Sequence, residues 1–565
     1  MAIEEAQQEV LSLDVLFVGG GPAGLAGALR LVQMVAAHNQ RGEGDPLDLE
    51  IGLIDKAREI GQHAISGAVF KPDYLRELIP DLETKGAPLE LKVRDNQFTV
   101  LFPGRAVKIP QFMIPRQNRH VGDVWTVSLG RLTQWMASQV EESGVYVFPD
   151  TTAVELLYDQ EGGVKGVRTG DKGLDREGRP RPNFQAGAIL EAKVTIFCEG
   201  PRGTMAEDLI NRFNLRADCN PQIYALGVKE TIRVPRDTPR QGTVVHTLGY
   251  PVPAYAFGGG FLYELADNHY SVGLVVGLDH GNPLLDIHAE FNRWKDHPFI
   301  RRFIDGGEVV SYGAKVIPEG GYFSLPRLYA PGALLTGDSA GLVNVSQLKG
   351  IHYAMKSGML AAEQAFSALR ANDTSAEGLS GYQKRIMEHP MMDSLRRDRN
   401  FRLAFKHGLP AGMVLSQVYA FMGGGPRKRR PVEEDWKTWR PASSFKPRPS
   451  VRKDPLLLDK LTDVDRSRTE HREDQPSHIQ VLDQEVCRNR CLPVLGHPPC
   501  THFCPAQVYE LTEDSGKPHI QVNFSNCVHC KTCVIVDPCK VGDQDNIQNI
   551  NWRAPAEGGP RYQIL

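Results

Sequence analysis

Residues 13–24 read LDVLFVGGGPAG, an apolar run followed directly by a glycine turn. The next residues, 25–35 (LAGALRLVQMV), repeat apolar side chains at helical spacing. The stretch therefore predicts a strand, a tight turn and a helix, which is the context that a dinucleotide-binding turn requires. Gly19 would permit the turn, Gly21 would let the backbone approach a pyrophosphate, and Gly24 would let the helix pack on the strand. The positive end of the helix would face the pyrophosphate charge.

Three further features favour a dinucleotide site over a purely structural glycine turn. The apolar run LEIGLID ends at Asp55, which could accept a hydrogen bond from a ribose hydroxyl, although Asp55 lies further along the chain than usual. VTIFCEG places Gly200 after another apolar strand, and LLTGDSAG places Gly337 and Asp338 after a third. NAD is the alternative ligand, but it needs only the first turn and would leave Gly200 and Asp338 unexplained.

These three glycine-bounded strands resemble the fingerprints of the glutathione-reductase-like FAD family. In that family the acid after the late strand holds the ribityl chain, and the following helix points its N-terminus at the flavin. The resemblance gives these roles to Asp338 and to a helix that begins near Gly350. Asp55 stands where the family most often has Glu. Many relatives also place an Arg before the helix RLTQWMASQV, where this sequence has Ser128; Arg131 is the nearby candidate to replace it, and the alternative is that no residue does.

Composition narrows the class of protein. A chain of 565 residues is too long for one compact core, so we expect two or three structural units. The net charge of −3 gives no indication of a nucleic-acid partner. No apolar run of about 20 residues is present, and the N-terminus has neither a signal-peptide core nor the Arg-rich pattern of a transit peptide. Between residues 80 and 330 the pattern indicates alternating strands and polar loops.

The cysteines are unevenly distributed. Of the ten, eight fall between Cys487 and Cys539, whereas Cys198 and Cys219 are typical of ordinary buried residues. A disulfide-stabilised secreted protein would spread its cysteines through a small domain. A cluster at one end of a large enzyme instead indicates a metal site in a reducing compartment.

One set of four cysteines has the pattern of an iron–sulfur site. CVHCKTC supplies three cysteines at two-residue gaps, and an upstream Cys-Pro pair supplies the fourth, as in bacterial ferredoxins. A zinc ribbon, the alternative, would prefer two Cys-x-x-Cys pairs. Thr532 and Tyr509 could donate hydrogen bonds to cluster sulfur, or they could simply pack there. The candidate ligands, called here the first quartet, are Cys504, Cys527, Cys530 and Cys533.

Four more cysteines occupy the same short module. In two-cluster ferredoxins each half gives three ligands to one cluster and its last cysteine to the other. Three of the remaining cysteines precede Cys504 and the fourth follows Cys533, which is the order that this rule requires. The segment PVLGHPP would have to fold outward, and a zinc site or four free thiols remain alternatives. This second quartet is Cys487, Cys491, Cys500 and Cys539.

Two neighbouring segments suggest contact with a membrane surface. HGLPAGMVLSQVYAFMGGG (407–425) is apolar but too short to span a bilayer. Residues 427–453 then contain ten Lys or Arg and three Asp or Glu, with Trp436, Trp439 and Phe445 among them. Basic residues with interfacial aromatics favour anionic headgroups. The alternative is a buried helix followed by a solvated basic loop.

An ordered set of motifs resembles the electron-transfer flavoprotein:ubiquinone oxidoreductase family over about residues 11–560. The motifs are EIGQHAISGAVFKP, AKVTIFCEG, VVGLDHGNP, AYAFGGGFLY, KGIHYAMKSGMLAAE, CPAQVYE, NCVHCKTC and NINW. The resemblance implies an α/β fold: a glutathione-reductase-like FAD-binding Rossmann domain, an inserted α+β quinone-binding domain and a C-terminal ferredoxin-like iron–sulfur domain. The FAD-binding domain is expected to be discontinuous, at residues 1–225 and 325–425, with parts of the quinone domain interleaved. The quinone-binding domain is expected at 226–324, a basic surface crossover at 426–474 and the 4Fe–4S domain at 475–565.

The resemblance also implies a function. Such a protein is an electron-transferring-flavoprotein dehydrogenase, which passes electrons through one 4Fe–4S cluster and FAD to ubiquinone or menaquinone. The family's quinone site matches Gly258 and Gly259, where a β-bulge or turn is the local alternative. Phe257 stands where the family has Tyr. The partners would be electron-transfer flavoprotein and membrane quinone, at the cytoplasmic face of a bacterial inner membrane.

Two other functions are compatible with the motifs. One is a soluble FAD-dependent reductase or hydroxylase with a fused ferredoxin, which would share the glycine turns but not the match through AYAFGGGFLY. The other is a flavin and ferredoxin electron-transfer component of a bifurcating complex. Fusion of both parts in one chain favours the quinone reductase over this component.

Overall fold

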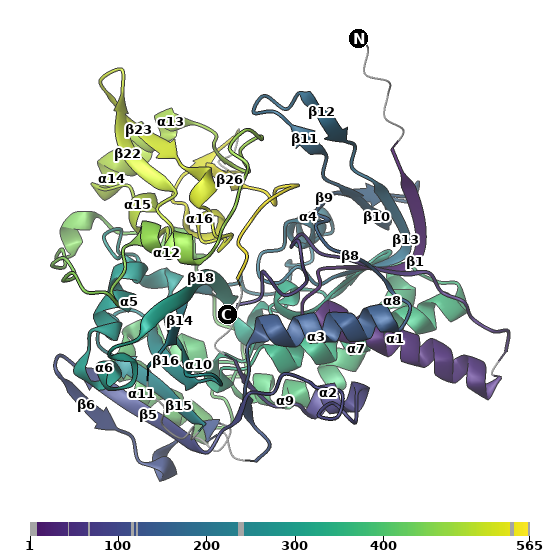
Figure 1. Ribbon diagram of the computed structural model, residues 1–565, viewed down its shortest axis with the longest axis horizontal. Helices are drawn as coiled ribbons and strands as arrows, with labels where there is room; N and C mark the ends of the chain where they lie inside the picture. Colours follow the sequence, from purple (N-terminus) through teal and green to yellow (C-terminus); the bar gives the residue numbers. More distant parts are fainter. Residues whose placement is uncertain are drawn as a thin grey trace.

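The computed structural model describes residues 8–42, 44–65, 68–114, 118–119, 122–235, 242–542 and 547–562. Part of the N-terminal segment considered above, and residues 66–67 of the EIGQHAISGAVFKP motif, lie outside these ranges. Figure 1 shows three packed regions: a sheet with long helices, a second sheet, and a C-terminal region in yellow.

The first region is built on a sheet whose described strands run in the order β19-β20-β13-β1-β2-β8, with β10 and β9 added beside β13. These strands are β1 Val10–Val18, β2 Ile51–Ile54, β8 Tyr146–Phe148, β9 Ala153–Tyr158, β10 Val164–Thr169, β13 Ile189–Phe197, β19 Tyr329–Ala330 and β20 Ala333–Leu335. β1 pairs in parallel with both β13 and β2, and β13 with β20. The carboxyl ends of these strands therefore meet at one edge of the sheet.

Long helices pack beside this sheet (Figure 1). They are α1 Pro22–Arg41, α3 Leu129–Glu142, α7 Ile351–Ala371 and α8 Ala376–Glu388. α1 begins with Pro22, whose ring presets a helical φ, and it ends at Gly42 in a left-handed conformation. Glycines let α1 and α7 approach closely, since a Cβ at Gly358 would lie 2.0 Å from the carbonyl oxygen of Ala23. The expected helix near Gly350 is α7.

The second region is a sheet in the order β18-β14-β17-β16-β15-β5-β6. Its described strands are β5 Asp95–Phe102, β6 Arg105–Lys108, β14 Tyr224–Arg233, β15 Thr243–Gly249, β16 Gly258–Glu264, β17 His269–Gly277 and β18 Glu308–Pro318. All neighbours are antiparallel except β15 and β5. β5 and β6 come from far upstream in the chain, so the two sheets are interleaved in sequence.

Helices also occur where strands and loops were expected. They are α4 Thr204–Arg212, α5 Ile287–Lys295 and α6 Pro298–Ile304. The Asp286 side chain caps α5 by accepting a hydrogen bond from the Ala289 amide, and Pro298 opens α6. Each helix is short, so its apolar period is easily hidden among the neighbouring strands. Phe291 and Trp294 of α5 are fully buried in the core of the second region.

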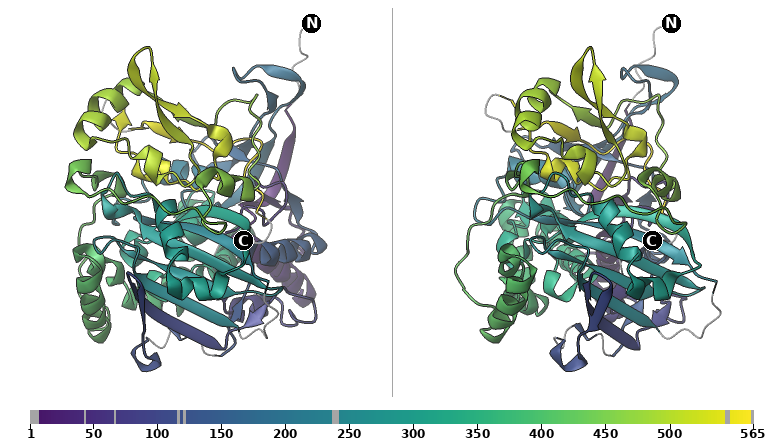
Figure 2. Two further views of the ribbon diagram at one scale, coloured as in Figure 1. Left: turned by 60° about the vertical axis from the view of Figure 1, so that its left-hand side comes forward. Right: turned by 90° about the vertical axis from the view of Figure 1, so that its left-hand side faces the viewer.

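The C-terminal region lies above the second sheet (Figure 2). Its described strands form three small hairpin-like pairs, β21 with β26, β22 with β23, and β24 with β25. Its elements are α12 Lys460–Arg466, β21 Ile479–Val481, α13 Gln484–Val486, α14 Leu492–Leu495, α15 Cys500–Phe503, β22 Tyr509–Asp514, β23 Lys517–Val522, α16 Cys533–Val536, β24 Lys540–Val541, β25 Ile547–Gln548 and β26 Ile550–Trp552. The eight cysteines of this region lie in loops and in short helical turns.

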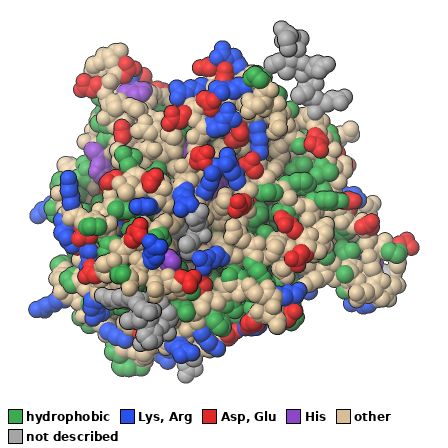
Figure 3. Space-filling view, viewed as in Figure 1, with side chains coloured by type: hydrophobic (Ala, Val, Ile, Leu, Met, Phe, Trp, Pro, Cys, Tyr) green, Lys and Arg blue, Asp and Glu red, His purple; other side chains and the backbone are tan. Residues whose placement is uncertain are grey.

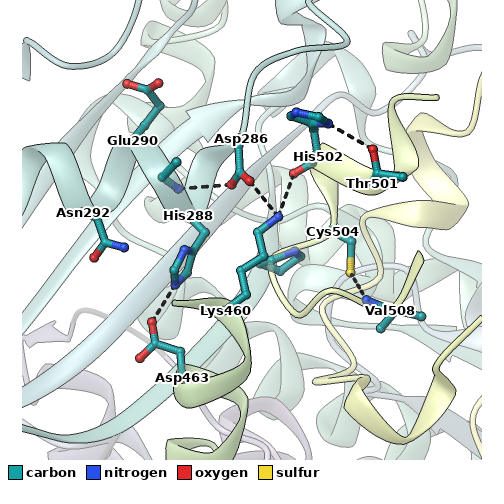
Figure 4. A network of polar contacts seen from close by, with 12 residues as sticks. Asp286, His288, Glu290, Asn292, Lys460, Asp463, Thr501, His502, Cys504 and Val508 are labelled. Atoms are coloured by element: carbon teal, nitrogen blue, oxygen red, sulfur yellow. Dashed lines mark hydrogen bonds and ion pairs between the residues drawn. The ribbon is translucent and has the colours of Figure 1, made fainter. Parts of the chain in front are cut away.

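A buried polar network joins this region to the second sheet (Figure 4). The Lys460 ammonium of α12 lies 2.8 Å from the Asp286 carboxylate and 3.5 Å from the carbonyl oxygen of His502. One turn later, Asp463 lies 2.6 Å from Nε2 of buried His288 on α5. α12 thus connects α5 to the cysteine-bearing helix α15.

The other α-helices and β-strands of the described chain are shorter or lie between these regions. They are β3 Val69–Phe70, α2 Asp73–Leu78, β4 Leu91–Lys92, β7 Trp125–Thr126, β11 Lys172–Leu174, β12 Pro180–Gln185, α9 Met391–Arg397, α10 Phe401–Ala404 and α11 Leu409–Phe421. Among the described helices, none combines the length and apolar character needed to cross a membrane.

Candidate cofactor sites

The glycine turn between β1 and α1 is sterically specified. Gly19 has φ +117°, and a Cβ there would lie 2.5 Å from the carbonyl oxygen of Cys198. A Cβ at Gly24 would lie 2.1 Å from the carbonyl oxygen of Gly19. At Gly21, by contrast, no described atom lies within 4 Å of that position. Gly19 and Gly24 therefore close the turn, and Gly21 leaves room for a phosphate at the N-terminus of α1.

Asp55 holds this turn in place. One carboxylate oxygen accepts a hydrogen bond from the Gly20 amide at 2.7 Å, and the other accepts from the Ala57 amide at 2.8 Å. Each carboxylate oxygen has a second lone pair, so Asp55 keeps the capacity to accept from a ribose hydroxyl. The hydrogen bonds that Asp55 makes within the chain fix the shape of the glycine turn.

The other two glycine-bounded strand ends lie against the turn. Gly200, at φ +73°, also has open space where a Cβ would be, within the described residues. Gly337 has φ +52°, and a Cβ there would approach that of Ala23 to 3.4 Å. The hydroxyl of Thr336 donates to Sγ of Cys198 at 3.1 Å. The structure thus brings together the three segments that the sequence separates.

Asp338 lies next to the N-terminus of α7. A Cβ at Gly350, the N-cap residue, would lie 3.8 Å from its carboxylate. Burial raises the pKa of Asp338 to about 6, an effect that the nearby Lys315 ammonium opposes. A half-buried carboxylate beside a helix N-terminus suits a ligand that donates hydroxyl hydrogen bonds. Both residues therefore fit an FAD site.

Ser128 and Arg131 have structural roles in this protein. The Ser128 hydroxyl accepts a hydrogen bond from the Arg131 amide and so caps α3. The Arg131 guanidinium lies 3.7 Å from Glu90. The described contacts of Arg131 therefore do not include the glycine turn.

The first quartet is brought together and buried in the C-terminal region. Sγ of Cys504 accepts from the Val508 amide at 3.4 Å, as Figure 4 shows, and Sγ of Cys527 accepts from the His529 amide at 3.4 Å. Burial raises the pKa of the Cys504 thiol to about 11. A bound iron–sulfur cluster would reverse that shift, because coordination deprotonates a thiol. Buried cysteines with amide N–H donors fit a 4Fe–4S cluster.

Side-chain donors also face these sulfur atoms. The Thr532 hydroxyl lies 3.3 Å from Sγ of Cys530, and the Tyr509 hydroxyl faces Cys533. The indole N–H of Trp552 faces Cys527 and has no other hydrogen-bond partner among the described residues. Trp552 belongs to the NINW motif, but no local pattern connects it with a cysteine 25 positions earlier.

Three buried imidazoles lie together beside the loop of the first quartet, and no sequence motif points to them. Those of His471, His478 and His529 have ring nitrogens within 4.8 Å of one another. Burial lowers the pKa of each, so all three are neutral. Nε2 of His471 contacts the carbonyl oxygen of Cys527 at 3.0 Å. The three histidines thus pack against the loop that carries Cys527.

The first quartet lies directly against the glycine turns. The Lys531 ammonium donates to the carbonyl oxygens of Pro201 and Arg202, at 3.1 and 2.9 Å. The Val316 amide of β18 donates to the carbonyl oxygen of Cys530 at 3.2 Å. Lys315, the preceding residue, is half-buried and lies near both Asp338 and Cys530. Short protein paths therefore connect the two cofactor sites.

The structure accounts for Gly258 and Gly259 without a ligand. They begin β16, where a Cβ would lie 2.3 Å from the carbonyl oxygen of Val275 or 2.4 Å from that of Thr247. Close strand neighbours therefore require both glycines. The ring of Phe257 packs 4.8 Å from that of Phe405.

The basic segment 427–453 is largely exposed, and some of its side chains contact the rest of the chain. The Trp439 side chain packs against the C-terminal region. Its indole N–H donates to the carbonyl oxygen of Val536 at 2.6 Å. Arg448 pairs with Glu290, and other basic side chains pair likewise. Over the face drawn in Figure 3, Lys and Arg are intermingled with Asp and Glu. Apolar exposure is instead pronounced along α11 and just after it, at Val414, Val418, Phe421 and Met422.

The second quartet also converges. All four cysteines line one small pocket, together with Asp537 and Pro538. The residues that line this pocket do not include those of the glycine turns.

Comparisons with known proteins agree with this geometry. The family model "ETF-QO, ubiquinone-binding" matches residues 224–317, and "Electron transfer flavoprotein-ubiquinone oxidoreductase, 4Fe-4S" matches residues 454–563. The chain is 39% identical over 567 residues to the electron transfer flavoprotein-ubiquinone oxidoreductase of Pseudomonas aeruginosa, covering 98% of this chain and 99% of that protein. It is 38% identical over 563 residues to the human mitochondrial protein of that name, covering 97% and 88%. Its fold is similar to that of a geranylgeranyl bacteriochlorophyll reductase-like protein from Thermoplasma acidophilum, with TM-score 0.54, 18% identity and coverage of 74% and 92%.

Proposed function

Because this chain belongs to the electron transfer flavoprotein-ubiquinone oxidoreductase family, we propose that it passes electrons from reduced electron-transfer flavoprotein to a membrane quinone. The cofactors are FAD and a 4Fe–4S cluster, which together convert one-electron delivery into two-electron reduction of the quinone. The contact between Lys531 and the loop at Pro201 carries this proposal. It joins the loop of the cluster ligands to the FAD-binding edge of the first sheet.

The residues of this chain would act by binding, spacing and electrostatic tuning. Gly19, Gly21 and Gly24 would hold the pyrophosphate, and Asp338 would accept from the ribityl chain. Asp55 would order the turn and receive the ribose, while Gly200, Gly337 and Gly350 would give the flavin close backbone contact. We assign the cluster to the first quartet. Gly258 and Gly259 would border the quinone, with Phe257 supplying an apolar surface in place of a hydroxyl.

Membrane binding in this proposal is peripheral and uses α11. The side chains of Val414 and Phe421 are 68% and 94% exposed, which is unusual for apolar residues on a helix of a globular protein. Such a helix can lie in the interfacial plane of a bilayer. All ten cysteines are free in the described chain, as suits the reducing cytoplasmic face of a bacterial inner membrane.

The test is quinone reduction by reduced electron-transfer flavoprotein, with flavin and iron quantified on the same sample. We expect turnover with either ubiquinone or menaquinone analogues that requires the flavoprotein donor. A protein that holds both cofactors yet reduces no quinone would overturn the proposal. In that case, reduction of a soluble substrate would favour the alternative of a soluble reductase.

A further inference from the structure

The second quartet converges from three separate stretches of chain. Cys487 and Cys491 close a single π-helical turn, Cys500 opens α15, and Cys539 follows α16. All four side chains line the same pocket. We propose that they bind a second 4Fe–4S cluster, in addition to the cluster of the first quartet.

Local geometry explains how irregular spacing still produces a site. π-helical turns are rare and recur at functional sites. After the π-helical turn Cys487–Cys491, α14 ends at Gly496. This glycine has a left-handed conformation with φ +71°, which reverses the chain. Pro499 then precedes α15 as its N-cap residue, and Cys500 is the first residue of that helix. The eight residues between Cys491 and Cys500 therefore form a compact excursion that returns to the pocket.

Two short segments each carry one cysteine from each quartet. Cys500 and Cys504 stand at the two ends of α15, about 6 Å apart along the helix axis. Cys533 opens α16, and Cys539 lies just beyond its end. Two-cluster ferredoxins share ligands between their halves in this crossed manner. The second cluster would therefore neighbour the first, and it would take up one electron for each electron that it passes on.

One buried donor reaches a sulfur atom of the second quartet, and further hydrogen bonds hold the loop around it. The amide Nδ2 of Asn549, a fully buried residue, donates to Sγ of Cys487 at 3.3 Å, and its backbone N–H donates to the carbonyl oxygen of Cys539. The backbone N–H of Cys539 in turn donates to the carboxylate of Asp537 at 3.1 Å. Hydrogen bonds of this kind orient ligands and tune the potentials of iron–sulfur clusters.

The two alternatives fit less well. A tetrahedral zinc site holds its sulfur atoms about 3.8 Å apart. Among the described residues, no three of these sulfur atoms lie within 4.8 Å of one another, although Cys539 lies in hydrogen-bond contact with Cys487 and with Cys491. Four unused thiols would place oxidisable groups beside an iron–sulfur cluster. A cubane accommodates wider sulfur spacing because the iron and sulfide atoms fill the centre.

The test uses the full chain, purified anaerobically, with iron, acid-labile sulfide, zinc and FAD quantified together. We expect about eight iron atoms per FAD in the parent protein and about four in Cys487→Ser. Cys219→Ser is the matched control, because its half-buried thiol lies outside the C-terminal region, and it should keep the parent content. Electron paramagnetic resonance of the reduced parent should show two magnetically coupled spins per FAD, reduced to one in Cys487→Ser.

Two results would overturn the second cluster. One is about four iron atoms per FAD in the parent, unchanged in Cys487→Ser; the other is about four iron atoms with one zinc that Cys487→Ser removes. If Cys487→Ser does not fold, the iron and spin counts of the parent decide alone. Quinone reductase activity on the same samples separates this inference from the proposed function. Activity with four iron atoms overturns only the second cluster, and eight iron atoms without activity overturn only the function.

Discussion

Asp338 is half-buried and lies at the position expected for the ribityl chain. Asp338→Ala should remove a hydrogen bond to a charged acceptor, which is worth roughly 1.5–3 kcal/mol, and weaken FAD binding by about tenfold or more. Flavin-to-protein ratios after dialysis measure this loss. Asp338→Asn is the control, because its amide oxygen still accepts, so it should retain more flavin than Asp338→Ala. Equal and complete occupancy of both variants would contradict the assignment.

The same carboxylate predicts a pH dependence of the apoprotein. Its folded pKa of about 6 lies above the unfolded value near 3.9, so the folded state binds the proton more tightly. The ionised carboxylate therefore destabilises the fold above pH 6, and this penalty disappears as pH falls from about 6 to 4. Asp338→Asn should stabilise the apoprotein at pH 7 by roughly 2–3 kcal/mol and give no advantage at pH 4. Melting temperatures of FAD-free protein across this range provide the measurement; an advantage independent of pH would sink the argument.

Thr532 offers a second test at the level of one side chain. Its hydroxyl lies 3.3 Å from Sγ of Cys530 and would stabilise negative charge on a reduced cluster. Thr532→Val should lower the cluster potential by on the order of 1 kcal/mol, or several tens of millivolts. Thr532→Ser keeps the hydroxyl and serves as the control. Redox titration by electron paramagnetic resonance distinguishes them, and equal potentials in the two variants would rule out this role.

At the scale of elements, a buried ion pair fastens α5 to the second sheet. The Lys295 ammonium pairs with Glu230 of β14 and donates to the carbonyl oxygen of Leu456 at 2.6 Å, and both charged side chains are fully buried. Burial raises the pKa of Glu230, and the adjacent Lys295 ammonium opposes that shift. Lys295→Met should destabilise the fold by about 3–5 kcal/mol, because it leaves an unpaired buried carboxyl group. The double variant Lys295→Met/Glu230→Gln should recover part of that loss in denaturant unfolding, whereas additive losses would contradict the pairing.

Across the whole molecule, local patterns were predictable and long-range contacts were not. The glycine turn at Gly19 and the cysteine spacing at Cys527 are set by neighbouring residues, so the family, fold class and cofactors expected from them are confirmed. Trp552 and Lys315 approach the cluster only through tertiary packing, and no periodicity in the sequence encodes that approach. The membrane role expected of the basic crossover stays a prediction: its charge is visible in sequence, but the packing of half-buried Trp439 against the C-terminal region is not.

Membrane attachment is a property of the whole molecule and depends on which face meets the bilayer. The apolar side chains along α11 face outward, whereas several basic residues of the crossover are already paired with acids of the chain. Apolar contact should therefore contribute more to vesicle binding than charge does. Phe421→Asp should weaken binding by about tenfold or more, since burial of one phenylalanine is worth roughly 1.5–3 kcal/mol.

The control for this prediction is Leu511→Asp. Leu511 is a 46% exposed apolar residue on β22, in the C-terminal region that Figure 1 draws at the opposite end from α11. The Leu511→Asp variant should bind vesicles as strongly as the parent protein does. Sedimentation with anionic and neutral vesicles at low and high salt completes the experiment, and salt should weaken binding of the parent only in part, because screening acts on the unpaired charges alone. Complete release by salt, with Phe421→Asp unaffected, would show instead that the basic crossover holds the protein to the membrane.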